Sequence, residues 1–245
     1  MMPSPTMFRA GLLWSLLALL WSLDAPAALT VAGTRFVYHA KVSSLSIRVG
    51  NSGDQPTLLQ AWLDKGDVAA DPRKLNVPFV LFPPIQRLEP QQRSALELRY
   101  TGEPLPRDRE SVFWINLLEV PPRPAGSKYL LQLSYRMRMK LLFRPDGLPG
   151  LPEQAAAQLS WALESVPQRA LRIGNRSAYY VSMSHLTLGS GTRSIHFEGI
   201  TVEPYGTTRI ALPEAKERLA KGTTIHFEVV DDNGTPFSAS AQMQD

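Results

Sequence analysis

The side chains that most often carry chemistry are few in this chain, and their spacing argues against catalysis and metal binding. There is no cysteine, which excludes thiol nucleophiles, disulfides and thiolate metal sites. The histidines His39, His185, His196 and His226 form neither an H-x-H pair nor an H-E-x-x-H motif. No serine lies in a G-x-S-x-G motif, and there is no Walker or G-x-G-x-x-G loop. The sequence therefore predicts a protein that is not an enzyme and that uses no metal or other cofactor.

Three basic residues, Arg136, Arg138 and Lys140, alternate along one segment and would share one face of a strand. Such a face can bind nucleic acid, but a solvated strand face is the simpler explanation. The chain has 26 Lys+Arg and 22 Asp+Glu, and this formal net charge of +4 is only mildly basic. We therefore expect no nucleic-acid partner.

The segment that holds these residues, 129–143 (YLLQLSYRMRMKLLF), has the most informative pattern in the chain. Fifteen extended residues span about 50 Å, whereas an average strand has about 5–6 residues. One explanation is a long core strand that bends between two sheets. The other is an exposed apolar edge that pairs with a strand of a partner protein. The large apolar side chains occupy every odd position: Tyr129, Leu131, Leu133, Tyr135, Met137, Met139, Leu141 and Phe143.

Short strands and turns fill most of the remaining sequence. The chain has 21 Pro, about 9% of its residues, which favours turns and edge strands over long helices. Apolar and polar residues alternate with period two, for example in 45–49 (LSIRV) and 95–100 (ALELRY). Residues 144–152 (RPDGLPGLP) indicate a linker. We therefore predict an all-β protein with two antiparallel sandwich domains, at residues 28–145 and 149–245.

The N-terminal residues have the pattern of a secretory signal sequence. Arg9 supplies a positive charge, residues 11–23 (GLLWSLLALLWSL) are apolar, and 25–27 (APA) match a cleavage site. A membrane anchor needs about 20 apolar residues, and this run is shorter. We therefore predict that residues 1–27 are a signal peptide and that the mature protein does not insert into a membrane; an N-terminal anchor or a buried helix is the alternative.

Residues 105–122 (LPRDRESVFWINLLEVPP) resemble, without a gap, the signature of the periplasmic chaperones of the chaperone–usher pathway. These chaperones assemble pili and fimbriae. The resemblance covers nearly the whole mature chain, more loosely in its second half. The other matching segments are 33–38 (GTRFVY), 82–84 (FPP), 88–90 (LEP), 140–145 (KLLFRP), Asn175 with 179–181 (YYV), and 230–234 (VDDNG).

The resemblance implies two immunoglobulin-like domains, arranged as a boomerang with a cleft between them. It also implies that the long strand is donated to a pilus subunit whose own fold lacks its last strand. Apolar side chains of the donor strand would then fill the open groove of the subunit. The donor positions that the resemblance implies are Tyr129, Leu131, Leu133, Tyr135 and Met137.

Two basic residues, Arg35 and Lys140, match the cleft pair that anchors the C-terminal carboxylate of the subunit in this family. Charge-assisted hydrogen bonds are about twice as strong as neutral ones, so this pair would set the register of the added strand. Without the resemblance, both residues would be interpreted as solvated charges at strand ends. Because Lys140 and Tyr135 have opposite parity in the strand, we expect a bulge near residues 135–138 that brings both to the cleft.

Three charged residues, Glu110, Arg144 and Asp232, match the ion network between the domains of this family. The resemblance gives them a structural role, which is to hold the angle between the domains. The second domain departs from the family pattern around this position, and Asp231 is therefore the alternative to Asp232.

Together these observations predict a non-enzymatic, ATP-independent periplasmic chaperone. It would bind pilin or fimbrial subunits by donor-strand complementation and deliver them to an outer-membrane usher. Release by exchange for the N-terminal strand of another subunit would require no nucleotide, and two copies of the free chain can also cap each other as a dimer. The alternative is a secreted two-domain β-sandwich that binds a carbohydrate or a cell-surface ligand.

Overall fold

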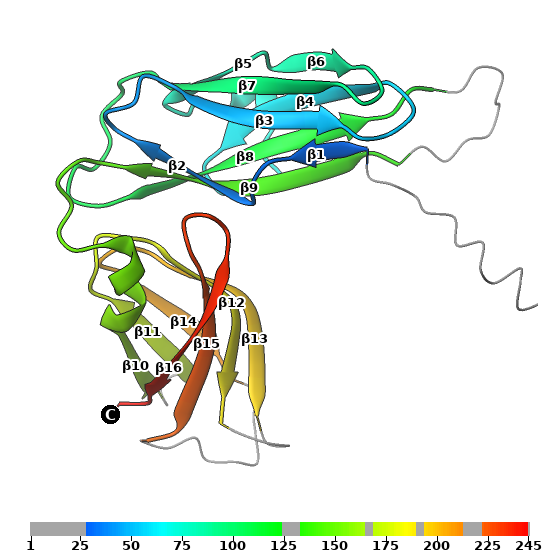
Figure 1. Ribbon diagram of the computed structural model, residues 1–245. Helices are drawn as coiled ribbons and strands as arrows, with labels where there is room; N and C mark the ends of the chain where they lie inside the picture. Colours follow the sequence, from blue (N-terminus) through cyan, green and yellow to red (C-terminus); the bar gives the residue numbers. More distant parts are fainter. Residues whose placement is uncertain (1–27, 124–132, 165–168, 190–193, 213–221, 245) are drawn as a thin grey trace, which may run out of the picture.

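Strands make up most of the computed structural model, which describes residues 28–123, 133–164, 169–189, 194–212 and 222–244. The expected signal peptide, residues 1–27, and the donor positions Tyr129 and Leu131 lie outside the described residues. The strands form two β-sandwiches set at an angle, like the arms of a boomerang (Figure 1). The expected all-β fold with two sandwich domains is therefore confirmed.

The N-terminal sandwich packs a four-stranded sheet, in the order β1-β3-β7-β5, against a five-stranded sheet, in the order β2-β9-β8-β4-β6. Between β1 and β2 the chain passes from one sheet to the other through Gly33, whose φ of 119° favours glycine. The elements are β1 (Leu29–Val31), β2 (Arg35–His39), β3 (Leu45–Asn51), β4 (Thr57–Asp64), η1 (Pro72–Lys74), β5 (Phe79–Phe82), β6 (Ile85–Leu88), β7 (Arg93–Tyr100), β8 (Ser111–Val120) and β9 (Tyr135–Arg144).

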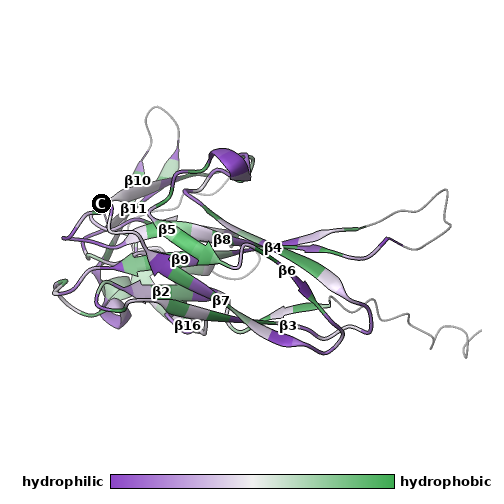
Figure 2. Ribbon diagram, turned by 90° about the horizontal axis from the view of Figure 1, so that it is seen from above, coloured by the Kyte–Doolittle hydropathy of each residue, from purple (hydrophilic) through white to green (hydrophobic). Residues whose placement is uncertain are grey.

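Alternating residues of these strands meet between the two sheets and form the core of the N-terminal domain. Apolar (green) and polar (purple) segments succeed one another along the strands in Figure 2. Aromatic rings cluster at one end of the core: the ring centroid of Phe79 lies 5.5 Å from that of Tyr38 and 5.0 Å from that of Phe113. Burying such a side chain contributes about 1.5–3 kcal/mol to folding, so the core fixes the strands that carry the site.

The C-terminal sandwich packs a three-stranded sheet, β10-β11-β14, against a four-stranded sheet, β13-β12-β15-β16. Its core contains the fully buried Trp161, whose ring centroid is 5.0 Å from that of Phe227. A short 3-10 helix that begins at a proline leads into it. The elements are η2 (Pro152–Gln158), β10 (Leu159–Glu164), β11 (Ala170–Asn175), β12 (Val181–Leu188), β13 (Ile195–Val202), β14 (Thr207–Ala211), β15 (Thr224–Val230) and β16 (Pro236–Gln242).

The pairing of β2 with β9 positions the inter-domain residues. The two strands are parallel, and Arg35 lies opposite Lys140. Directly opposite residues on adjacent strands project to the same face of a sheet. The two basic side chains, which are 105 positions apart in the sequence, therefore lie side by side, on the face that turns toward the C-terminal domain.

Candidate functional site

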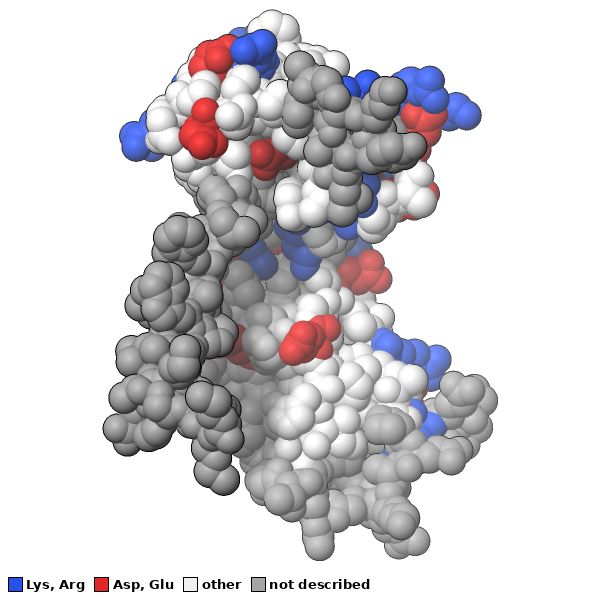
Figure 3. All heavy atoms as spheres, turned by 90° about the vertical axis from the view of Figure 1, so that its right-hand side faces the viewer, with Lys and Arg blue, Asp and Glu red and all other residues white. Residues whose placement is uncertain are grey.

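A cavity of about 420 Å³ lies between the two domains, with Arg35 and Lys140 in its wall. Figure 3 shows Lys and Arg side chains gathered in the hollow between the domains. No carboxylate is among the residues that line this cavity in the described part of the chain. The N-terminal domain contributes Thr34, Arg35, Trp114, Arg138 and Lys140, and the C-terminal domain contributes Ser182, Met183, Ser184, Gly199, Ile200, Thr201 and Val230.

Both anchor candidates are held by groups of the C-terminal domain. The Nη1 atom of Arg35 donates a hydrogen bond of 2.7 Å to the carbonyl oxygen of Val230. The Nζ atom of Lys140 donates to the hydroxyl oxygens of Ser182, at 2.7 Å, and Thr201. These neutral acceptors orient the two cations but leave their charges without a carboxylate partner in the cavity wall, which suits an incoming anion.

Burial and, to a smaller extent, the nearby charge of Arg35 together lower the pKa of Lys140 to about 8. Burial also lowers the pKa of Arg35, although Asp232, Asp231 and Glu110 counteract that effect. A bound carboxylate would favour the charged form of both side chains. The cavity therefore has the electrostatics of an anion site.

The cavity wall includes an aromatic side chain that the sequence analysis did not single out. Trp114 lies opposite Lys140 on β8, and the guanidinium carbon of Arg138 lies 4.0 Å from the centroid of its ring. Ser182 and Thr201 were not predicted either, because nothing in the local pattern shows that these strands face the other domain. The sequence did contain a signal for Trp114. It lies in the family-like segment 105–122, between the apolar residues Phe113 and Ile115, both of which are buried.

The described donor positions lie on β9 or just before it. Leu133 and Tyr135 are 56% and 55% exposed, and Met137 is half-buried. From Met139 onward the odd positions join the core of the N-terminal domain. The apolar face therefore extends beyond the core that covers it, and its first part is open to solvent.

One edge of β9 is also open over the same residues. On one side, β9 pairs with β8 from Tyr135 to Phe143. On the other side, β2 pairs only with Lys140 to Arg144. Among the described strands, none pairs with this second edge from Tyr135 to Met139. The backbone groups there can accept another strand.

The expected bulge near residues 135–138 is wrong. The register between β8 and β9 runs without a shift from Ser111–Phe143 to Glu119–Tyr135. The strand is regular, so Tyr135 and Lys140 project to opposite faces. The reason is the continuous pairing with β8, which holds β9 in one register from Tyr135 to Phe143.

Glu110, Arg144 and Asp232 come together where the two domains meet. The Nε atom of Arg144 donates to Glu110 Oε1 at 2.6 Å, and its two Nη atoms donate to the carboxylate of Asp232 at 2.6 and 2.9 Å. Glu110 also accepts a hydrogen bond from the backbone N–H of Tyr180 at 2.8 Å. Asp231, the alternative, instead accepts hydrogen bonds from the backbone of its own turn.

The Glu110 side chain is completely buried and that of Arg144 is 10% exposed. Burial raises the pKa of Glu110, while the adjacent guanidinium of Arg144 lowers it. Such a buried pair is costly to break, because each charge depends on the other. The network thus links β9 of the N-terminal domain to the loop after β15.

Within the described ranges, no group of three or more His, Asp or Glu side chains is arranged to hold a metal ion. In that same part of the chain, no helix is long and apolar enough to cross a membrane.

Comparison with known proteins gives matches over nearly the whole chain after residue 27. Residues 28–149 match the family model of the pili and flagellar-assembly chaperone PapD N-terminal domain, and residues 154–240 match that of the pili assembly chaperone PapD C-terminal domain. The probable fimbrial chaperone YadV of Escherichia coli K12 is 35% identical, over 91% of this chain and 93% of its own. The chaperone protein FimB/FhaD of Bordetella pertussis is 37% identical, over 88% and 89%.

Solved structures agree with these matches. The crystal structure of the YadV chaperone aligns with a TM-score of 0.75 and 34% identity, over 88% of this chain and 99% of that chain. The structure of the Salmonella enterica SafA pilin in complex with the SafB chaperone aligns with a TM-score of 0.72 and 28% identity, over 87% and 95%.

Proposed function

The chain belongs to the family of pili assembly chaperones, and we propose that it captures a pilin or fimbrial subunit by adding the exposed part of β9 to the subunit's incomplete sheet. The observation that carries this proposal is the open edge of β9, which ends at Arg35 and Lys140. The open edge of β9 therefore ends at the anion site formed by Arg35 and Lys140. The SafA–SafB complex, in which a related chaperone holds a pilin, supports it.

The position of the anion site fixes the direction of the added strand. Its C-terminal carboxylate would lie beside Lys140, where β2 begins. Its preceding residues would then lie beside Met139 and continue toward Tyr135. The added strand would therefore run parallel to β9, with its last residue adjacent to the first residue of β2. The anion site sets the register, because a shift of one residue would move the carboxylate away from Arg35.

The exposed apolar face provides the hydrophobic part of the affinity. Leu133 and Tyr135 are open to solvent, and Met137 is half-covered. Each such side chain that leaves water contributes about 1.5–3 kcal/mol. The family resemblance adds Tyr129 and Leu131 as donor positions, which lie outside the described residues.

The proposal includes the cellular setting. The protein acts in the periplasm after removal of residues 1–27 and passes its subunit to an outer-membrane usher, without nucleotide, cofactor or catalysis. Because the strand that completes the bound subunit belongs to the chaperone, its exchange for the N-terminal strand of another subunit would supply the free energy of release. Without a subunit, two copies can cap each other through the same edge, and size-exclusion chromatography of the free protein would detect this dimer.

A double substitution on the donor face tests the proposal. We expect Leu133→Asp/Tyr135→Asp to reduce capture of the pilin from the same genetic locus at least about 100-fold, because two apolar contacts are lost and two charges would enter the groove. The measurement is periplasmic co-expression followed by affinity purification. Val80→Asp is the matched control, because Val80 is an equally exposed apolar residue, at 56%, on β5. Equal pilin recovery from the double variant and the control would reject the donor face.

Affinity for the subunit should also depend on pH through Lys140. In the free protein its pKa is about 8. A bound carboxylate would raise this pKa, so binding takes up a proton once the free side chain is neutral. Affinity should therefore be constant below about pH 7 and fall at higher pH, by up to about tenfold per unit above pH 8. Subunit dissociation constants measured from pH 6.5 to 9.5 test this. Lys140→Arg should remove the dependence, and a dependence unchanged in that variant would exclude Lys140 as its source.

A further inference from the structure

The tetrapeptide Ile-His-Phe-Glu occurs twice in the C-terminal domain, at residues 195–198 of β13 and 225–228 of β15. Both copies flank β12 in the same register. His185 lies opposite Glu198 on one side and Glu228 on the other. Phe227 is buried in the core and Phe197 packs against it, so alternation directs the glutamates to the outer face of the sheet.

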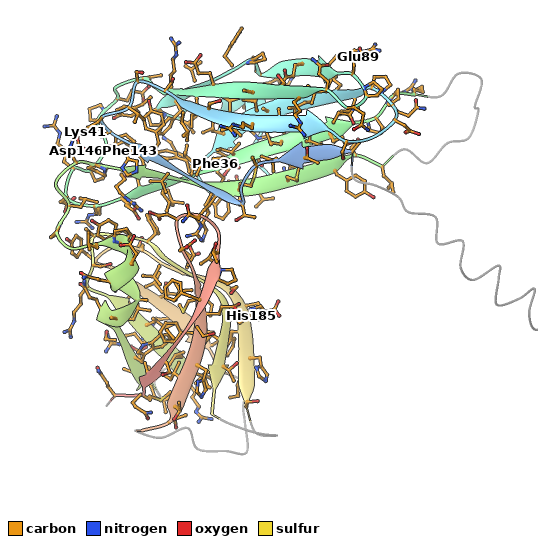
Figure 4. The ribbon with its side chains drawn as sticks, viewed as in Figure 1. Phe36, Lys41, Glu89, Phe143, Asp146 and His185 are labelled. Carbon is orange, nitrogen blue, oxygen red and sulfur yellow. The ribbon has the colours of Figure 1, made fainter. Side chains whose placement is uncertain are left out.

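The result is a row of two carboxylates and one imidazole on three neighbouring strands, which we call the acidic patch: Glu198, His185 and Glu228. The Nδ1 atom of His185 lies 3.0 Å from a carboxylate oxygen of Glu228, and its Nε2 atom lies 3.8 Å from one of Glu198. Hydrogen bonds from Ser184 and then His185 lower the pKa of Glu228, which favours its ionised form. The side chains of Glu198 and His185 are 79% and 64% exposed. His185 lies at the outer side of its domain (Figure 4).

A bulge joins the acidic patch to the cleft. The register between β12 and β15 shifts between Met183 and His185, and Gly199 on β13 has a φ of 67°. A bulge lets two successive residues face the same side, and bulges of this kind occur next to binding sites. Ser184 and Gly199, the neighbours of His185 and Glu198, line the inter-domain cavity. The acidic patch is therefore a continuation of the cavity wall.

The charges of the two surfaces have opposite sign. The cavity contributes Arg35 and Lys140, which have no carboxylate partner in its wall, and Arg138, which is paired with Asp64. The adjoining wall contributes two carboxylates. Figure 3 shows acidic side chains on the C-terminal domain below the basic hollow. In the proposed complex, a subunit strand beside β9 that ends at Lys140 would bring the body of the subunit next to this wall.

We propose that the acidic patch binds a lysine- or arginine-bearing segment of the same subunit whose C-terminal carboxylate occupies the cleft. This inference rests on the proposed function and adds a second, electrostatic recognition element to it. A partner then needs an anionic terminus and a cationic surface in a fixed relation, which gives specificity and orientation more than affinity. An apolar strand with a free C-terminal carboxylate but no basic segment would meet only the first of these two requirements.

The test uses the full chain in complex with the pilin from the same genetic locus. We expect Glu198→Gln/Glu228→Gln to raise the dissociation rate of the complex by about 2- to 10-fold at low salt, as for loss of two exposed ion pairs. The matched control is Glu89→Gln/Glu97→Gln, which removes two exposed carboxylates from the N-terminal domain. In the wild type, carbodiimide should couple Glu198 or Glu228 to a lysine of the subunit, and mass spectrometry identifies the linked peptides.

Equal dissociation rates for the two double variants, together with no cross-link at Glu198 or Glu228, would overturn the inference. That result would leave the proposed function standing if Arg35→Ala still weakens capture of the subunit. Capture that survives both Arg35→Ala and the donor-face variant would instead reject the proposed function itself. The two failures are therefore distinguishable in one set of complexes.

Discussion

Arg35→Ala and Lys140→Ala should each lower the affinity for a subunit by about 10- to 100-fold, and together they should abolish its recovery. A hydrogen bond to a charged group contributes about 1.5–3 kcal/mol, and each 1.4 kcal/mol is a factor of ten. The effect is large because no other cation of the cavity wall forms a hydrogen bond across the domain boundary in the described structure. Arg35 donates to Val230, and Lys140 donates to Ser182 and Thr201, so these two side chains are the ones held ready for a carboxylate.

A control variant distinguishes loss of the carboxylate anchor from a general loss of positive charge. Lys41→Ala removes the same charge from the N-terminal domain, but the side chain of Lys41 is 76% exposed and lies outside the cleft cavity. Purified variants should keep the far-UV circular dichroism and urea midpoint of the wild type. If Lys41→Ala reduces pilin recovery as much as the cleft variants do, a general charge effect explains the result and the anchor is excluded.

The strands could be predicted from the sequence because their cause is local. In β4 and β7 the buried and exposed residues alternate as the sequence pattern requires. The meeting of Arg35 with Lys140 has no local cause. It follows from the parallel pairing of two strands 105 residues apart, which alternation does not encode. Only the family resemblance singled out both residues.

The residues of the C-terminal domain that contact Lys140 could not be predicted from local patterns either. Ser182 and Thr201 are small polar residues in ordinary strands, and their contact with Lys140 depends on how two complete sandwiches meet. The incorrect bulge has a related origin. The expectation of a bulge assumed that Tyr135 and Lys140 must lie on the same face of β9. In the regular strand they lie on opposite faces, and the backbone end and the side chains of an added strand also point in different directions.

The ion network at the junction carries the second large prediction: Arg144→Ala should destabilise the protein by about 3–5 kcal/mol. The substitution leaves the completely buried carboxylate of Glu110 with only the Tyr180 N–H of its present partners and removes both hydrogen bonds to Asp232. Burial already raises the pKa of Glu110, and loss of the cation would raise it further. Urea unfolding measures the change.

The sign of the pH dependence identifies the cause. A carboxyl group whose pKa is higher in the folded than in the unfolded state takes up a proton on folding, so stability falls as pH rises between the two pKa values. The loss caused by Arg144→Ala should therefore be larger at pH 8 than at pH 5, and adding Glu110→Gln should recover part of it. Arg87→Ala is the control, because Arg87 forms an exposed ion pair with Glu89 within the N-terminal domain, and such pairs contribute little to stability. An equal loss from both arginine variants would mean that the network does not hold the two domains together. An effect of Arg144→Ala that is the same at both pH values would mean that the buried charge of Glu110 is not its source.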